Sequence, residues 1–169
     1  MNLALERYKD TPDVWHIAGY NEDIPQNRGS NHASLWRFMS CWGWATWADS
    51  WTHYSRDPEE LVHLFTDEDI HRFNLDGAND FWAQVLANKS GELKTWAVFW
   101  YATIFRNGGL CLFPQFSYVE NIGFDGSGSH GVVNSSYGRA GLNTSIDPIW
   151  PAKIVEDAAA LGQLKDYYT

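Results

Sequence analysis

Residues 40–51, with the sequence SCWGWATWADSW, contain four of the ten tryptophans in this chain of 169 residues. Tryptophan carries a large ring whose indole N–H needs a partner when buried. Such a concentration therefore indicates either a dense core or a surface for a flat apolar ligand, such as a pyranose ring. A glycine at position 43 allows the backbone to approach another group closely. We expect a tight turn at Trp42-Gly43, with Trp42, Gly43 and Trp44 lining a pocket.

The second half of this stretch has the periodicity of a helix. Trp44, Trp47 and Trp51 are spaced i, i+3 and i+7, which is the spacing of one apolar stripe on a helix surface. We therefore expect a helix from Ala45 onward, with Trp47 and Trp51 packed in the core.

The flanking segments predict a single α/β domain over residues 1–169. A short helix over 1–9 precedes a buried strand over 14–20, and the polar segment 21–34 is expected to be a loop. A helix followed by a strand is half of a βαβ unit, so we expect a preceding strand that this sequence does not contain. Further helices are expected from Asp57, from Thr66, after Asn79, over 95–106 and over 151–161, with a strand over 110–113.

Composition narrows the possible partners and location. The formal net charge is −9, which argues against nucleic acid, because nucleic-acid binders use Lys and Arg to neutralise phosphates. The longest apolar run, 96–105, is half of the roughly 20 residues that a membrane-spanning helix needs. The first ten residues include several charged side chains, which is not the pattern of a secretory signal peptide. Cys41 and Cys111 have no metal-binding or redox spacing, so we expect free thiols in the cytoplasm.

A second informative segment is glycine-rich and covers residues 121–131, NIGFDGSGSHG. Backbone N–H groups in such a segment can converge on an anion. Ser127 and Ser129 add hydroxyl donors, Asp125 is a candidate ligand for a hard cation, and His130 could bind a metal or a diphosphate oxygen. A surface loop without function is about twice as common an explanation for a single motif of this kind.

Other polar residues give weaker signals for catalysis. Asp49 follows the tryptophan turn and Asp80 lies at a predicted helix start, where a carboxylate is stabilised in any case. Glu22 and Asp23 are adjacent acids that could exchange protons, although adjacent acids are more often solvated. His16 lies in the predicted buried strand, where a hydrogen-bonded core residue is more common than a ligand.

Several motifs, in the same order along the chain, resemble the C-terminal half of bacterial family-2-like glycosyltransferases with the GT-A fold. The start of the chain, with ALERYKD at 4–10 and HIAGYN at 16–21, is similar to the helix and strand that follow the metal-binding Asp-x-Asp strand in those enzymes. The remaining motifs are CWGWATW at 41–47, TWA at 95–97 with Trp100-Tyr101, GGL at 108–110, Pro114 and NIGFDGSGSH at 121–130.

The resemblance implies transfer of a sugar from a nucleotide-diphosphate donor to a glycan or lipid-linked acceptor. Trp42, Gly43 and Trp44 would line the pocket for the donor sugar and the acceptor. A base would accept the proton of the acceptor hydroxyl, and Asp49 and Asp80 are its candidates. In distant eukaryotic relatives of this family, the catalytic carboxylate comes directly after a tryptophan that aligns with position 96. In this chain, alanine and valine follow that position instead.

The resemblance also implies a divalent metal, Mn²⁺ or Mg²⁺, bound together with the nucleotide sugar. Gly126, Ser127 and Ser129 would contact the substrate, and Asp125 and His130 would contact the metal. The loop that carries Ser129 and His130 would close over the diphosphate and stabilise its growing negative charge.

The sequence departs from this family in its missing nucleotide-binding half. Residues 1–169 contain no Asp-x-Asp preceded by an apolar strand. We therefore expect a partial GT-A, Rossmann-like domain that needs a separate N-terminal half or associates as a homo-oligomer. Two alternatives remain: a non-catalytic carbohydrate-binding module that uses the tryptophan turn, and an inactive remnant.

Overall fold

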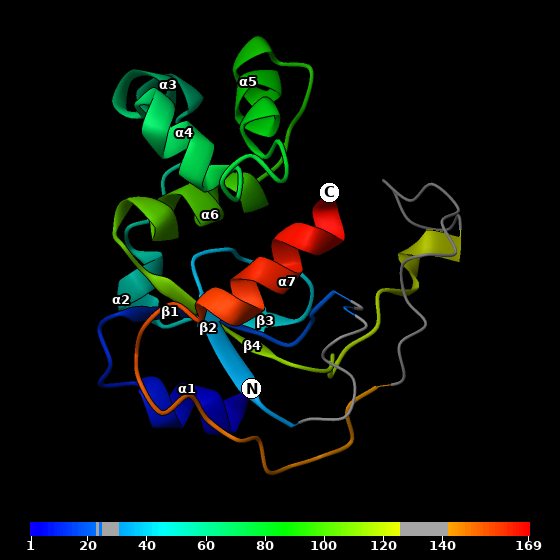
Figure 1. The fold of residues 1–169 in the computed structure, drawn as a ribbon. Coiled ribbons are helices and arrows are strands. Elements are labelled where there is room, and N and C mark those ends of the chain that lie inside the picture. The colour runs from blue at the N-terminus through cyan, green and yellow to red at the C-terminus, as the bar shows by residue number, and fades with distance from the viewer. Residues whose placement is uncertain (23, 25–30, 126–141) are drawn as a thin grey trace.

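The computed structural model describes residues 1–22, 24, 31–125 and 142–169. Within them, a four-stranded sheet has the strand order β2-β4-β1-β3 (Figure 1). The two central strands, β1 and β4, run parallel, and each edge strand pairs with its neighbour in the antiparallel direction. The prediction of an α/β fold is confirmed. The strands are β1 (Val14–Ala18), β2 (Ala33–Trp36), β3 (Trp44–Ala45) and β4 (Leu110–Pro114).

Helices cover both faces of this sheet. The helix α1 lies against one face, whereas α6 lies against the other, with α3, α4 and α5 stacked beyond it (Figure 1). None of the described helices combines the length and apolar character that crossing a bilayer requires. The helices are α1 (Asn2–Tyr8), α2 (Ala48–Trp51), α3 (Pro58–Leu64), α4 (Asp67–Phe73), α5 (Trp82–Ser90), α6 (Ala97–Arg106) and α7 (Ala158–Tyr168), and a 3-10 helix, η2, covers Ile122–Asp125.

The core is divided by the sheet, because successive side chains of a strand point to opposite faces. In β4, Cys111 and Phe113 pack on the α6 side, whereas Leu112 packs on the α1 side. In β2, Trp36 packs on the α6 side and Leu35 on the α1 side. The helix predicted over 95–106, apolar on most sides, is α6, which begins at Ala97 and fills the larger of the two cores.

Local capping signals were reliable guides to the helices beyond the sheet. The carboxylate of Asp57 accepts a hydrogen bond from the backbone N–H of Glu60, and Pro58 occupies the first position of α3. The side chain and backbone of Thr66 exchange hydrogen bonds with Asp69 at the start of α4, which is a capping box. Both predicted helix starts are confirmed.

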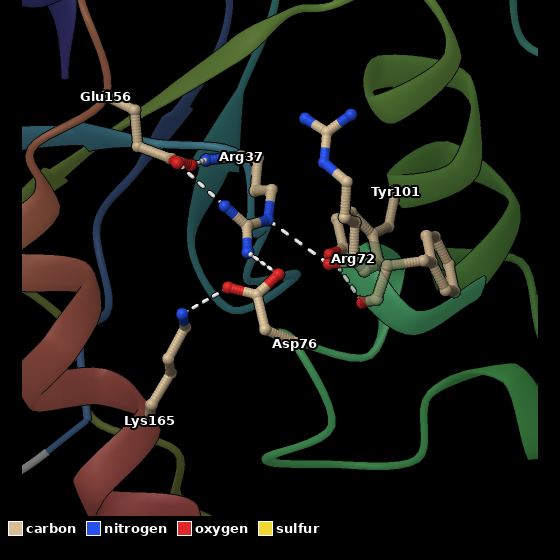
Figure 2. Close-up of polar contacts among 7 residues, drawn as sticks. Arg37, Arg72, Asp76, Tyr101, Glu156 and Lys165 are labelled. Carbon is tan, nitrogen blue, oxygen red and sulfur yellow. Dashed lines mark hydrogen bonds and ion pairs between the residues drawn. The ribbon is translucent and has the colours of Figure 1, made fainter. Parts of the chain in front are cut away.

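A charged cluster fastens the C-terminal segment to the body of the protein. The Arg37 side chain is only 11% exposed; its guanidinium contacts Glu156 and Asp76 at 2.7 Å each, and its Nε donates to the carbonyl of Arg72 (Figure 2). Lys165 of α7 forms an ion pair with the other oxygen of Asp76. Burial alone would raise the pKa of Asp76, but hydrogen bonds and charges from Lys165 and Arg37 lower it.

Three predicted boundaries are wrong. The helix after the tryptophan turn begins at Ala48, not Ala45, because residues 44–45 pair with β1 as an edge strand. The predicted loop over 21–34 ends early, since β2 begins at Ala33. The last helix, expected over 151–161, runs from Ala158 to Tyr168.

The tryptophan stripe is also corrected. Trp44 lies on β3 and Trp47 is the N-cap of α2, so the three tryptophans do not share one helix. Trp51 was expected in the core but is 38% exposed, and Trp47 is half-buried.

Candidate functional site

The tryptophan turn is fixed by a close approach between two backbone segments. Gly43 has a φ of +58°, which confirms the predicted tight turn. Its carbonyl accepts a hydrogen bond from the N–H of Gly19, at 2.6 Å, just after β1. A Cβ on Gly43 would lie 2.7 Å from Val119 Cγ1, and a Cβ on Gly19 would lie 2.5 Å from the Gly43 carbonyl oxygen. Only glycine therefore fits at either position.

His16 lies buried next to the turn and contacts the residues on both sides of it. Its Nδ1 lies 3.2 Å from the indole Nε1–H of Trp100, a donor, so Nδ1 is the acceptor and the proton is on Nε2. The Nε2–H donates to the carbonyl of Ser40, at 3.0 Å, and the ring stacks on Trp44 with centroids 5.3 Å apart. Burial lowers the pKa of His16 to about 3, against the opposing effect of the Ser40 hydrogen bond. His16 is thus a neutral, hydrogen-bonded core residue, as its place in a buried strand predicted.

A pocket of about 410 Å³ opens beside the turn. This volume falls within the range of about 300–1,000 Å³ typical of small-molecule sites. The Trp42 ring at its edge packs against Tyr20, with ring centroids 4.5 Å apart at 72°. Its walls are mostly apolar and are formed by residues of the loop before the turn, α6 and the α5 N-terminus, including Phe38, Met39, Phe81, Ala97, Val98 and Tyr101.

Glu22 is the acidic residue that lines this pocket. Its carboxylate oxygens accept hydrogen bonds from Tyr168, at 3.1 Å, and from Tyr20, at 3.2 Å. Burial raises the pKa of Glu22, and this effect outweighs the hydrogen bonds from Tyr168, Tyr20 and Tyr167, which lower it. A carboxylate with a raised pKa beside an apolar pocket has the properties of a group that exchanges protons with a ligand.

The two acids predicted as catalytic candidates lie elsewhere. Asp80 is exposed, and its carboxylate accepts from Asn74 and from the backbone N–H of Ala83, so it caps the start of α5. Asp49 is exposed on α2 and lines a separate pocket of about 190 Å³. Neither lines the pocket that contains Trp42, so we assign neither a role in the mechanism.

Of the three predicted pocket residues, the structure brings Trp42 to the pocket wall. Gly43 forms the turn that presents it, and Trp44 points into a group of aromatic rings with Trp51 and Trp96.

The glycine-rich segment is described only in part. Gly126, Ser127, Ser129 and His130, predicted to bind substrate and metal, lie outside the described residues. Asp125 ends the 3-10 helix η2. Within the described part of the chain, no three His, Cys, Asp or Glu side chains gather as a metal site would require.

From the sequence alone, the pair Glu22 and Asp23 indicates solvated acids. The importance of Glu22 depends on Tyr168, which lies 146 residues further along the chain. A signal was nevertheless present, because Glu22 follows the carboxyl end of β1, next to the segment that meets the tryptophan turn. Such strand ends are where α/β proteins commonly bind ligands.

Comparison of the chain with protein-family models, curated proteins and solved structures finds no match. The likeness to GT-A glycosyltransferases therefore remains a prediction from the order of the motifs, to be judged on the chemistry of this pocket.

Proposed function

We propose that this chain contributes the acceptor site of a glycosyltransferase, which transfers a sugar from a nucleotide-diphosphate donor to a glycan or lipid-linked acceptor. The observation that carries the proposal is the carboxylate of Glu22 in an apolar pocket beside the Trp42 ring. An aromatic ring suits the C–H face of a pyranose, and a desolvated carboxylate suits the hydroxyl that reacts.

In this proposal Glu22 is the general base. The acceptor hydroxyl oxygen attacks the anomeric carbon of the donor sugar, and a new C–O bond forms. The bond between that carbon and the diphosphate breaks, and the diphosphate leaves with the electron pair. The hydroxyl proton passes to Glu22, whose raised pKa makes it a better proton acceptor than an ordinary carboxylate.

The donor and its metal remain predictions of the resemblance. Asp125 and His130 are the candidate ligands for Mn²⁺ or Mg²⁺, and among the described residues no three His, Cys, Asp or Glu side chains gather as a metal site. The proposal includes a GT-A fold completed by a separate N-terminal half or a second copy, and a reaction in the cytoplasm, where the free thiols of Cys41 and Cys111 would stay reduced.

A second candidate is a carbohydrate-binding module without catalysis. The exposure of tryptophan rings next to the turn favours this alternative, because such modules need only stacking surfaces.

The test combines calorimetry with a transfer assay. Binding heats are measured for oligosaccharides selected on a printed glycan array and for nucleotide-diphosphate sugars with Mn²⁺ or Mg²⁺. Because the proposal requires the completed fold, the measurements use the chain in its assembled form, as an oligomer or with the separate N-terminal half. We expect both classes to bind to this assembly and Trp42→Ala to abolish oligosaccharide binding. Binding of oligosaccharide alone would support the module instead, and binding of neither class would overturn both.

The catalytic role is tested with Glu22→Gln, which keeps the shape of the side chain. We expect transfer, followed by mass spectrometry of the acceptor, to fall by about 10²–10⁴ while oligosaccharide affinity is retained. Glu92→Gln, the same change at an exposed position, is the matched control and should leave transfer unchanged. Equal rates for the Glu22→Gln and Glu92→Gln variants would disprove the assignment of the base.

A further inference from the structure

Four aromatic side chains next to the tryptophan turn form a second surface, here called the aromatic platform: Trp44, Trp51, Tyr54 and Trp96. Trp51 and Trp96 are 38% and 39% exposed, which is unusual for the residue type with the largest apolar ring. Trp44 lies between them, with ring centroids 5.6 Å from Trp51 and 5.3 Å from Trp96. The rings are therefore adjacent rather than scattered singly over the surface.

The rings of the platform pack on one another and on buried side chains. Trp51 stacks on Tyr54 with centroids 4.5 Å apart at 4°, and it also contacts the fully buried Trp100 at 4.9 Å. Trp44 stacks on the buried His16. A ligand that contacts these rings would not have to order them first, which reduces the entropy lost on binding.

The platform lies next to the proposed acceptor pocket along the chain. Trp96 immediately precedes Ala97, which lines that pocket, and Trp44 is two residues beyond Trp42. His16 connects the two regions, because it binds the carbonyl of Ser40 on the pocket side and stacks on Trp44 on the platform side. At the other wall, Asn88 donates hydrogen bonds both to the carbonyl of Gln84, which lines the pocket, and to the hydroxyl of Thr95, next to Trp96. These contacts place Trp96 near the pocket, on the side where a longer ligand would extend.

The chemistry of the platform matches a neutral, polyhydroxylated chain. Its four members carry no charge, and the protein has a net charge of −9, which disfavours a polyanion. Neighbouring tryptophan faces suit successive pyranose rings, whose C–H groups pack on aromatic surfaces. The Thr95 hydroxyl, beside Trp96, accepts a hydrogen bond from Asn88 and can donate its own proton to a sugar hydroxyl at the rim.

We propose that the aromatic platform is a subsite for sugar residues of the acceptor beyond the one that reacts, so that the preferred acceptor is an oligosaccharide rather than a monosaccharide. This inference rests on the proposed function, since it takes the pocket beside Trp42 as the place where the reacting sugar binds.

The experiment compares ligand length across variants of the intact chain. Calorimetry is performed with a monosaccharide, a disaccharide and a tetrasaccharide of the type selected on the glycan array. We expect affinity to rise with length in the wild type. Trp96→Ala should weaken tetrasaccharide binding by about 2- to 12-fold, the range of one aromatic contact, and leave monosaccharide binding unchanged. Trp96→Phe should restore most of the loss.

The outcomes separate this proposal from the proposed function. If Trp42→Ala abolishes binding of every ligand but Trp96→Ala and Trp51→Ala change none, the platform proposal is wrong and the acceptor pocket stands. If the wild type binds no saccharide of any length, the proposed function itself fails. If Trp96→Ala instead dissociates an oligomer in gel filtration without changing saccharide affinity, the platform is an interface between copies and the subsite is disproved. Thermal melting of each variant verifies folding.

Discussion

At the scale of single residues, His16 shows how burial selects a protonation state. Its two ring nitrogens have fixed partners, an indole donor on Nδ1 and a carbonyl acceptor on Nε2. A second proton would face the donor hydrogen of Trp100 inside a fully buried site. The neutral tautomer is therefore part of the folded structure, and its pKa of about 3 records that requirement.

His16 should make the protein lose stability in mild acid. The folded state keeps it neutral down to about pH 3, whereas the unfolded chain takes up a proton near 6.5. The unfolded state thus binds more protons over this window, and His16 makes the free energy of unfolding fall by about 1.4 kcal/mol per pH unit as pH decreases. Urea titrations between pH 7 and 4 measure this slope.

The matched variants are His16→Gln and His53→Gln, the latter at an exposed position. The slope should become shallower in His16→Gln and stay as in the wild type in His53→Gln. A slope that His16→Gln leaves unchanged would contradict the assignment of a neutral histidine.

Single residues also show where sequence reasoning succeeded at the site. The Trp42-Gly43 turn was predictable, because the positive φ of Gly43 is a local requirement. The role of Glu22 was not, because its burial is created by Tyr168 and by walls from α5 and α6, none of them near it in sequence.

At the scale of elements, the Arg37 cluster decides where the last helix lies. The segment before α7 supplies Glu156 to Arg37, and the N-cap Asp157 both caps α7 and donates its N–H to the carbonyl of Leu35 in β2. These contacts with distant elements set the helix start at Ala158. The sequence gives no sign of these contacts, so the proline at position 151 indicated a helix start that is too early.

Replacing Arg37 by methionine should release this anchor. Asp76 and Glu156 would lose their shared partner, and we expect a loss of about 2 kcal/mol, below the value for a fully buried pair because both carboxylates are about one-third exposed. Chemical denaturation measures the loss, and hydrogen exchange should show it first in α7.

Arg106→Met is the control, since its ion pair with Glu60, at 3.3 Å, is exposed. We expect an effect of about 1 kcal/mol or less. Similar losses in the two variants would mean that the Arg37 cluster does not anchor α7.

At the scale of the whole molecule, the pocket brings together residues that are far apart in the sequence. Glu22 follows the first strand and Tyr168 ends the last helix, and a hydrogen bond connects them. In the sheet, β4 lies between β1 and β2, although it follows both in the sequence. Periodicity predicted β1, β4 and most helices, but it does not encode which strands are neighbours, and β2 and β3 were too short to be recognised.

Tyr168→Phe should raise the pKa of Glu22 further. The lost hydrogen bond is one that stabilises the charged carboxylate, so its removal favours the protonated form. An NMR titration of the Glu22 carboxyl carbon measures the change. Tyr54→Phe removes a hydroxyl that does not contribute to the Glu22 pKa and should leave the titration as in the wild type. An unchanged midpoint in Tyr168→Phe would show that α7 does not tune the site.

The contact between Gly19 and Gly43 limits how this molecule can evolve. A Cβ on Gly19 would meet the Gly43 carbonyl oxygen, and a Cβ on Gly43 would meet the Val119 side chain, so each position is restricted to glycine. Sequences that diverge elsewhere but retain the pocket should keep glycine at both positions. That paired identity is a better marker for distant relatives than the tryptophans, whose large side chains other aromatic residues can replace.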